Sequence, residues 1–278
     1  HRLHTAREGK RVDMLEFGMP TLIELPGLED CARLCAELGM RFIELNMCLP
    51  QYQIDRIDPE RLNRIADKYG IYYTIHLDET ISPCDFNPRI ANACLDTITD
   101  TILLSKRIGI KLLNTHLSLG THFTLPEGKV LLFEKYHDEY LQNLTRFRDM
   151  CGATAGSDVR ICIENTPAFT HRLGCETLDF LLESRTFAVT FDTGHDAVGN
   201  FEQRPVIDRR LDRLCHMHLH DALVRERRDH LPLGDGELEL KEYLDLAAEY
   251  SCRVVVEVKT VDGLRRSVEW LQKHGYMR

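Results

Sequence analysis

The feature that most constrains the fold of this chain is a junction that occurs three times. A helical pattern closes on a glycine, and a short apolar run follows at once, within residues 38–45, 69–76 and 108–116. Glycine readily adopts the left-handed backbone conformation that ends a helix, and a short apolar run bounded in this way is typical of a buried strand. Each junction therefore predicts the helix-to-strand half of a βαβ unit.

The remainder of the chain continues this alternation. Eight apolar runs predict strands, at residues 14–19, 41–46, 71–77, 111–117, 159–164, 187–192, 214–220 and 253–258. Helical patterns lie between them, at residues 28–39, 58–69, 87–108, 130–151, 176–184, 205–212, 238–249 and 262–273. Eight units of about 35 residues match a (β/α)8 TIM barrel in count and length. No linker interrupts the pattern, so we expect one domain over residues 1–278.

A doubly wound open sheet is the alternative fold for such an alternation. That fold binds phosphate with a glycine-rich loop after an early strand, and the chain has no such loop. The barrel is therefore the predicted fold.

The composition excludes several classes of protein. Lys and Arg number 35 and Asp and Glu number 44, so the formal net charge is −9, and an acidic chain without a basic run argues against nucleic-acid binding. No stretch approaches the roughly 18 apolar residues of a membrane span. The ten cysteines are scattered without a C-x-x-C pair, which predicts reduced, buried thiols in a cytoplasmic protein.

Polar residues recur where the apolar runs end, and the active site of a TIM barrel lies at these ends of its strands. The third to the eighth run all end in a histidine or a carboxylate: His76 and Asp78, His116, Glu164, Asp192 and His195, His218 with His220 and Asp221, and Glu257. Charged groups at the mouth of an apolar barrel are costly unless they are paired or bind a cation. The sequence therefore predicts a metal site at this mouth.

Four of these residues come from four successive strands and form the predicted ligand set: Glu164, Asp192, His218 and Glu257. Three carboxylates and one imidazole suit Mn²⁺, Co²⁺ or Mg²⁺, with Zn²⁺ as a further option. His76 and His116 either complete a second metal site that shares Glu164 or donate hydrogen bonds to a substrate. His195 and His230 form a third cluster at the rim.

These residues resemble the xylose isomerase-like barrel superfamily, and the resemblance covers roughly residues 14–275. It is carried by five segments: Cys-Ile-Glu-Asn-Thr at 162–166, Phe-Asp-Thr-Gly-His at 191–195, Met-His-Leu-His-Asp at 217–221, His-Leu-Pro-Leu-Gly-Asp-Gly at 230–236 and Val-Glu at 256–257. Each segment is short, and their order and spacing make the resemblance specific. The superfamily holds sugar and sugar-phosphate isomerases and epimerases together with the family-two apurinic endonucleases.

Similarity to the isomerases and epimerases implies one divalent metal on the four predicted ligands. It also implies Glu164 and Glu257 as the acid/base pair and His195 as a substrate contact. The expected reaction is isomerisation or epimerisation of a small sugar, sugar phosphate or polyol ketone through an enediolate. Arg228 is a candidate for binding a substrate phosphate or carboxylate, and Lys259 is a second substrate-binding candidate because it shares the inward face with Glu257.

Two further readings share these residues. A dehydratase of a polyol ketone would use the same metal and base. A binding module that has lost catalysis would retain only the fold. The complete set of four ligands argues against the binding module. The expected partner is a small carbohydrate, and the sequence leaves homo-oligomer formation open.

Similarity to the endonucleases implies a three-metal cluster instead. The four ligands match one metal, His76 and His116 match ligands of a second, and His195 and His230 match part of a third. This interpretation is the main alternative.

Three departures weaken the endonuclease alternative. Arg228 stands where the third metal site of those enzymes uses an aspartate. Glu79 and Thr80 stand where they carry a Tyr-Leu wedge, and a carboxylate there repels a DNA backbone. Residues 46–61 offer no cluster of aromatic and basic side chains.

Overall fold

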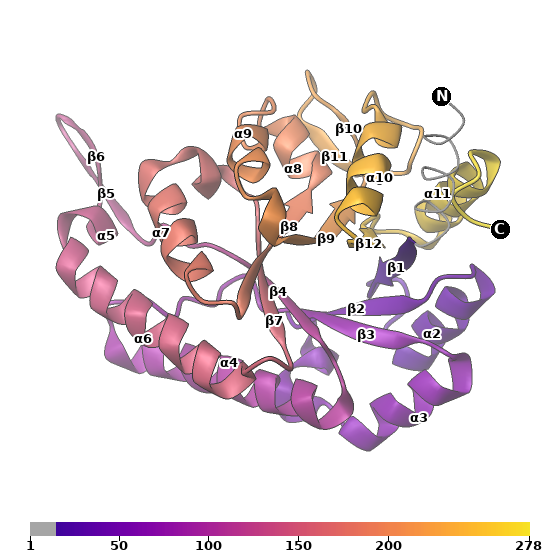
Figure 1. Ribbon diagram of the computed structural model, residues 1–278, viewed down its shortest axis with the longest axis horizontal. Coiled ribbons are helices and arrows are strands. Elements are labelled where there is room, and N and C mark those ends of the chain that lie inside the picture. Colours follow the sequence, from indigo (N-terminus) through magenta and orange to yellow (C-terminus); the bar gives the residue numbers. More distant parts are fainter. Residues whose placement is uncertain (1–14) are drawn as a thin grey trace.

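A computed structural model describes residues 15–278, and eight parallel strands close into a barrel at its centre (Figure 1). Around the barrel their order is β1-β12-β9-β8-β7-β4-β3-β2. The strands are β1 Glu16–Pro20, β2 Phe42–Asn46, β3 Tyr72–His76, β4 Leu112–His116, β7 Arg160–Glu164, β8 Phe187–Asp192, β9 Leu214–Leu219 and β12 Arg253–Val256. The predicted TIM barrel is confirmed. Residue 14 of the first predicted strand lies outside the described residues.

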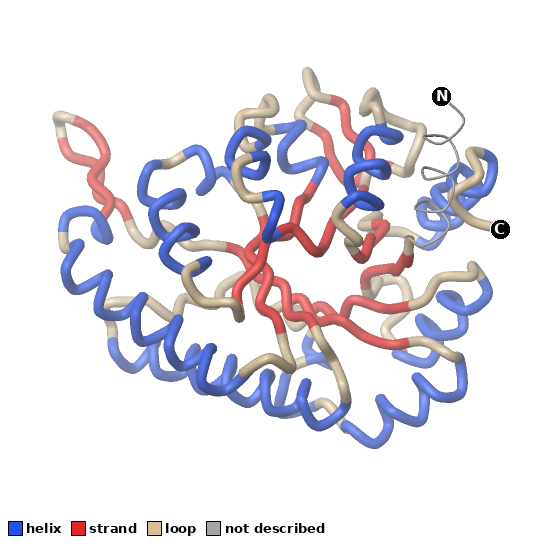
Figure 2. Tube along the Cα trace, viewed as in Figure 1, coloured by secondary structure: helices blue, strands red, loops and turns tan. Residues whose placement is uncertain are grey.

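Helices surround the strands, as Figure 2 shows by colour. The longer helices are α2 Leu28–Glu37, α3 Pro59–Tyr69, α4 Pro88–Ile108, α6 His137–Ala155, α7 Arg172–Leu182, α10 Leu240–Glu249 and α11 Val261–Lys273. Short helical segments are α5 Leu132–Lys135, α8 Thr193–Val198, α9 Arg204–Asp208, η1 Pro50–Tyr52, η2 Ile54–Arg56, η3 Pro167–Thr170 and η4 Leu211–Arg213. Gly70 and Gly109 end α3 and α4 in the left-handed conformation, with φ of 64° and 80°, as the junctions predict.

Two hairpins and one short helix depart from the predicted pattern. Hairpin β5 His122–Leu125 with β6 Gly128–Leu131 stands where the predicted helix at 130–151 was expected to begin. Hairpin β10 Asp221–Leu223 with β11 Arg228–Leu231 follows β9. Helix α8 starts directly after β8 because the Asp192 side chain accepts the His195 N–H and so caps it.

Side chains alternate between the two faces of each strand. On β7, Ile161 and Ile163 are fully buried in the main apolar cluster, while Cys162 belongs to a separate small cluster with Ala188. All ten cysteines are free thiols, and six of them are buried. The predicted burial is wrong for Cys48, which is exposed, and only partly right for Cys94, Cys175 and Cys215, which are half-buried. Within residues 15–278, every helix is too short or too polar to span a bilayer.

The left-handed glycine after α4 gives a stability test. Gly109 has φ of 80° and no atom within 4 Å of an added Cβ, so Gly109→Ala should cost about 1 kcal/mol from backbone strain alone. Gly152 lies inside α6, where an added Cβ makes only ordinary contacts. Gly152→Ala should therefore stabilise the chain by about 0.5 kcal/mol. Urea denaturation of both variants measures this, and equal effects of the two substitutions would contradict the assigned glycine role.

Candidate metal centre

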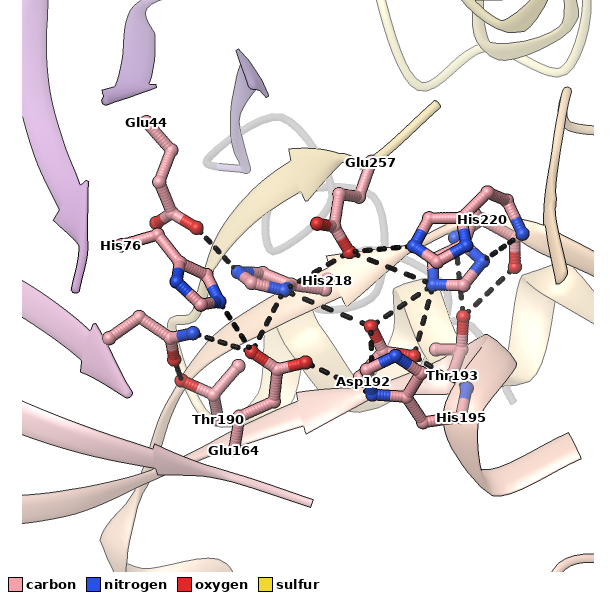
Figure 3. Close-up of polar contacts among 12 residues, drawn as sticks. Glu44, His76, Glu164, Thr190, Asp192, Thr193, His195, His218, His220 and Glu257 are labelled. Atoms are coloured by element: carbon pink, nitrogen blue, oxygen red, sulfur yellow. Dashed lines mark hydrogen bonds and ion pairs between the residues drawn. The ribbon is translucent and has the colours of Figure 1, made fainter. Parts of the chain in front are cut away.

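The four predicted ligands converge at the C-terminal mouth of the barrel (Figure 3). His218 Nδ1 lies 3.3 Å from Glu164 Oε2, 3.3 Å from Glu257 Oε2 and 3.8 Å from Asp192 Oδ2. Ligand atoms that each lie about 2.1 Å from one small divalent cation are roughly 3 Å apart. The spacing therefore suits one cation among these four side chains.

Two buried atoms that face each other in this cluster lack hydrogen bonds. His218 Nδ1 and Glu257 Oε2 are buried and make no hydrogen bond to any of residues 15–278. A buried polar atom without a partner is costly, and a cation bound by both atoms would remove that cost. The donor set of three carboxylates and one imidazole also matches a hard or borderline divalent ion. The residues therefore fit a divalent metal.

Electrostatic interactions keep the two glutamates ionised. Burial raises the pKa of Glu164, but the charges of His218 and His116 outweigh it and hold the pKa well below its usual range. Burial likewise raises the pKa of Glu257, but the charges of His218 and Lys259 outweigh this effect and hold the pKa well below its usual range. Two buried anions at one point favour binding of a cation.

A fourth carboxylate, Glu44 on β2, was not predicted from the sequence. It is 3% exposed, and its Oε1 lies 2.6 Å from His218 Nε2. Its Oε2 accepts a hydrogen bond from Thr74 Oγ1 at 2.7 Å and lies 2.8 Å from His216 Nε2. A carboxylate on the far nitrogen of a ligating histidine fixes the tautomer and orientation of the ring.

The sequence contains a signal for Glu44, although a weak one. It is a lone carboxylate within the apolar run of residues 42–45, two residues before its strand ends. Because Glu44 lies inside its strand, the rule that functional residues follow strand ends does not identify it.

Asn114 on β4 orients the Glu164 side chain through a hydrogen bond. Its Nδ2 donates a hydrogen bond to Glu164 Oε2 at 2.5 Å, and its Oδ1 accepts one from Thr190 Oγ1 at 2.6 Å. All three side chains are buried. This chain of hydrogen bonds across β8, β4 and β7 limits the directions in which the Glu164 carboxylate can point.

His76 and His116 contact the same Glu164 oxygen that faces His218. Their Nε2 atoms are 3.4 Å and 3.2 Å from Glu164 Oε2. His76 Nδ1 lies 2.7 Å from the Leu77 carbonyl oxygen, which can only accept, so Nδ1 carries a proton and the neutral ring offers Nε2 as a lone pair. The structure therefore brings together a second donor set that shares Glu164.

His195 and His230 lie at the rim, with ring centroids 6.0 Å apart. His195 Nδ1 is 3.1 Å from Glu164 Oε1, and although burial lowers its pKa, Asp192 and Glu164 raise the pKa of His195 to about 10. His230 Nδ1 lies 2.8 Å from Asp229 Oδ1. His195 is thus held by a predicted ligand, Glu164, and His230 by its neighbour Asp229.

The two substrate-binding candidates differ in position. Lys259 Nζ donates a hydrogen bond to Glu257 Oε1 at 2.7 Å, and its side chain is about half exposed. Arg228 is 63% exposed, with Glu226 as an ion-pair partner at 3.8 Å. The structure brings Lys259 into the cluster and leaves Arg228 on the exposed hairpin, so its substrate contact stays a prediction.

Comparison with known proteins agrees with this architecture. Residues 32–274 match the family model of the xylose isomerase-like TIM barrel. The uncharacterized protein MJ1188 of Methanocaldococcus jannaschii is 24% identical over 253 residues, which cover 85% of each chain.

Two solved structures share the fold. A D-tagatose 3-epimerase-like protein has a TM-score of 0.73 at 22% identity, covering 94% of this chain and 97% of its own. The 3-keto-D-glucoside 4-epimerase YcjR from E. coli has a TM-score of 0.72 at 14% identity, covering 93% and 99%. With the family model matched over most of its length, the chain belongs to the xylose isomerase-like TIM barrel family.

Proposed function

We propose that the protein is a divalent-metal-dependent isomerase or epimerase of a small sugar, sugar phosphate or polyol ketone. The observation that carries the proposal is the convergence of Glu164, Asp192 and Glu257 on His218 Nδ1. The names of both solved structures compared above, an epimerase and an epimerase-like protein, support the same class of reaction.

Glu164 and Glu257 are the proposed acid/base pair. They come from β7 and from the end of β12, three strands apart in the barrel, and each lies 3.3 Å from His218 Nδ1. They therefore face a bound substrate from two sides. One glutamate removes the proton from the carbon beside the carbonyl, and the other returns a proton. A divalent cation, when bound, supplies the charge that polarises the carbonyl and stabilises the enediolate.

The position of proton return determines the product. Return to the opposite face of the same carbon gives epimerisation, and return to the neighbouring carbon gives isomerisation. Lys259 holds Glu257 ionised and oriented through its 2.7 Å hydrogen bond. His195 lies against Glu164, and its proposed role is to donate a hydrogen bond to a substrate oxygen. A dehydratase would use the same base and lose water from the enediolate.

The second candidate function is an apurinic endonuclease-like phosphodiesterase with several zinc ions. The donor set of His76, His116 and Glu164 favours it. The exposed position of Arg228 argues against it, because that residue replaces an expected third-site ligand and stays outside the cluster.

Replacing either proposed base tests the mechanism. Glu164→Gln and Glu257→Gln should each lower ketose epimerisation or isomerisation by about 10²–10⁴-fold, because the amide cannot accept the substrate proton. A ketose panel with Mn²⁺ in D₂O, read by NMR, measures both product and deuterium incorporation. Glu226→Gln, on the exposed hairpin, is the control and should behave as wild type. Retained activity in both base variants would refute the assignment.

Metal content separates the two candidate functions. The isomerase proposal predicts one tightly bound divalent ion per chain, since a single set of four ligands is complete. Elemental analysis of the purified protein, with a nicking assay on duplex DNA that contains an abasic site, provides the measurement. Three zinc ions per chain together with nicking would establish the endonuclease instead.

Glu44 gives a test of the metal site away from the substrate. Glu44→Gln removes the negative charge that holds His218 and should weaken Mn²⁺ binding by about 10–100-fold. Glu16→Gln is the matched control, because Glu16 is also a strand carboxylate but bonds Tyr72 near the opposite end of the barrel. Titration calorimetry of the metal-stripped chains measures both. Equal affinity in Glu44→Gln and Glu16→Gln would contradict the role of Glu44.

A further inference from the structure

His220 is a fully buried histidine that follows β9 and lies beside Asp192 (Figure 3). It also contacts the β10–β11 hairpin through His230. Its Nε2 lies 3.0 Å from both carboxylate oxygens of Asp192. Its Nδ1 accepts a hydrogen bond from the backbone N–H of His230 at 2.7 Å. Both ring nitrogens therefore have partners, one at the predicted ligands and one on the hairpin.

These contacts determine the tautomer of His220. A backbone N–H can only donate, so Nδ1 must hold a lone pair. In the neutral ring the proton then lies on Nε2 and is donated to Asp192. His220, His230 and Glu257 come close enough to hold a metal, but a cation on His220 would have to displace one of these two bonds. The ring is better suited to orient a ligand than to be one.

The surrounding backbone is shaped to hold this ring. His230 has φ of 55°, an uncommon conformation for a residue with a side chain, and in it the His230 N–H bonds His220 Nδ1. The two imidazoles stack with centroids 4.2 Å apart. Gly194 lies on the other side, where an added Cβ would be 2.0 Å from His220 Cε1. Three separate features thus leave room for one orientation of His220.

We propose that His220 is a positioning residue that orients Asp192 for the cation, with its tautomer set by the β10–β11 hairpin. Asp192 Oδ1 accepts the His195 backbone N–H at 2.6 Å, whereas His220 Nε2 lies 3.0 Å from both carboxylate oxygens. Oδ2, 3.8 Å from His218 Nδ1, is then the oxygen that faces the cation. This role rests on the metal-dependent function proposed above.

Two amide substitutions at His220 separate its hydrogen bond to Asp192 from its hydrogen bond to the His230 N–H. In His220→Gln the side-chain amide reaches the position of Nε2 and keeps a donor to Asp192. In His220→Asn the amide oxygen reaches only the position of Nδ1, so it keeps an acceptor for the His230 N–H and loses the donor to Asp192. His220→Leu removes both bonds. His274→Asn, at an exposed histidine at the end of α11, is the control.

Mn²⁺ affinity of the metal-stripped full chain is the first readout. His220→Asn and His220→Leu should bind about 10–100-fold more weakly than wild type, while His220→Gln should stay within about threefold. Hydrogen exchange of the His230 amide is the second readout. Exchange should be faster in the Gln and Leu variants and as in wild type in the Asn variant. A purely structural role would move affinity and exchange together.

The contrast between the Asn and Gln variants decides the proposal even if the Leu variant does not fold. Wild-type affinity in His220→Asn, or equally weak affinity in His220→Gln and His220→Asn, would overturn the positioning role while leaving the metal site intact. Absence of divalent-ion binding by the wild-type chain would overturn the proposed function and this role with it.

Discussion

The arrangement depends on the burial of several carboxylates around one imidazole. Glu164, Asp192 and Glu257 face one nitrogen of His218, and Glu44 faces the other. Negative charges in an apolar barrel repel one another and lose hydration. Histidines and a lysine at the strand ends offset part of this charge, and the divalent cation proposed above would offset the rest.

Much of this could be predicted from the sequence because a closed barrel leaves little freedom at strand ends. Once eight apolar runs are recognised, the polar residue that follows each run must lie at one mouth. Glu164, Asp192, His218 and Glu257 meet there, as predicted. The fold also follows from the helix-ending glycines, of which Gly70 and Gly109 adopt the expected left-handed conformation.

The residues that support the ligands could not be found in this way. Glu44 and His218 meet because of their side-chain rotamers and the register of their strands. The sequence around residue 44 does not indicate a partner 174 positions away. His220 looks like the third of three alternating histidines, and its function depends on the backbone of His230. The sequence predicts Asp192 only as the end of a strand. Its second role, as the N-cap of α8, is visible only in the folded turn.

The hydrogen-bonded interior of the barrel has an evolutionary consequence. Thr190, Asn114 and Glu164 form one chain of hydrogen bonds, and Thr74 and Glu44 form another. Changing one member leaves its buried partner without a hydrogen bond. We therefore expect these interior positions to change in pairs or not at all among related chains. The β5–β6 hairpin, whose β5 residues are all exposed, carries no such restriction. We therefore expect sequence change among relatives to concentrate in that hairpin and to be rarest inside the barrel.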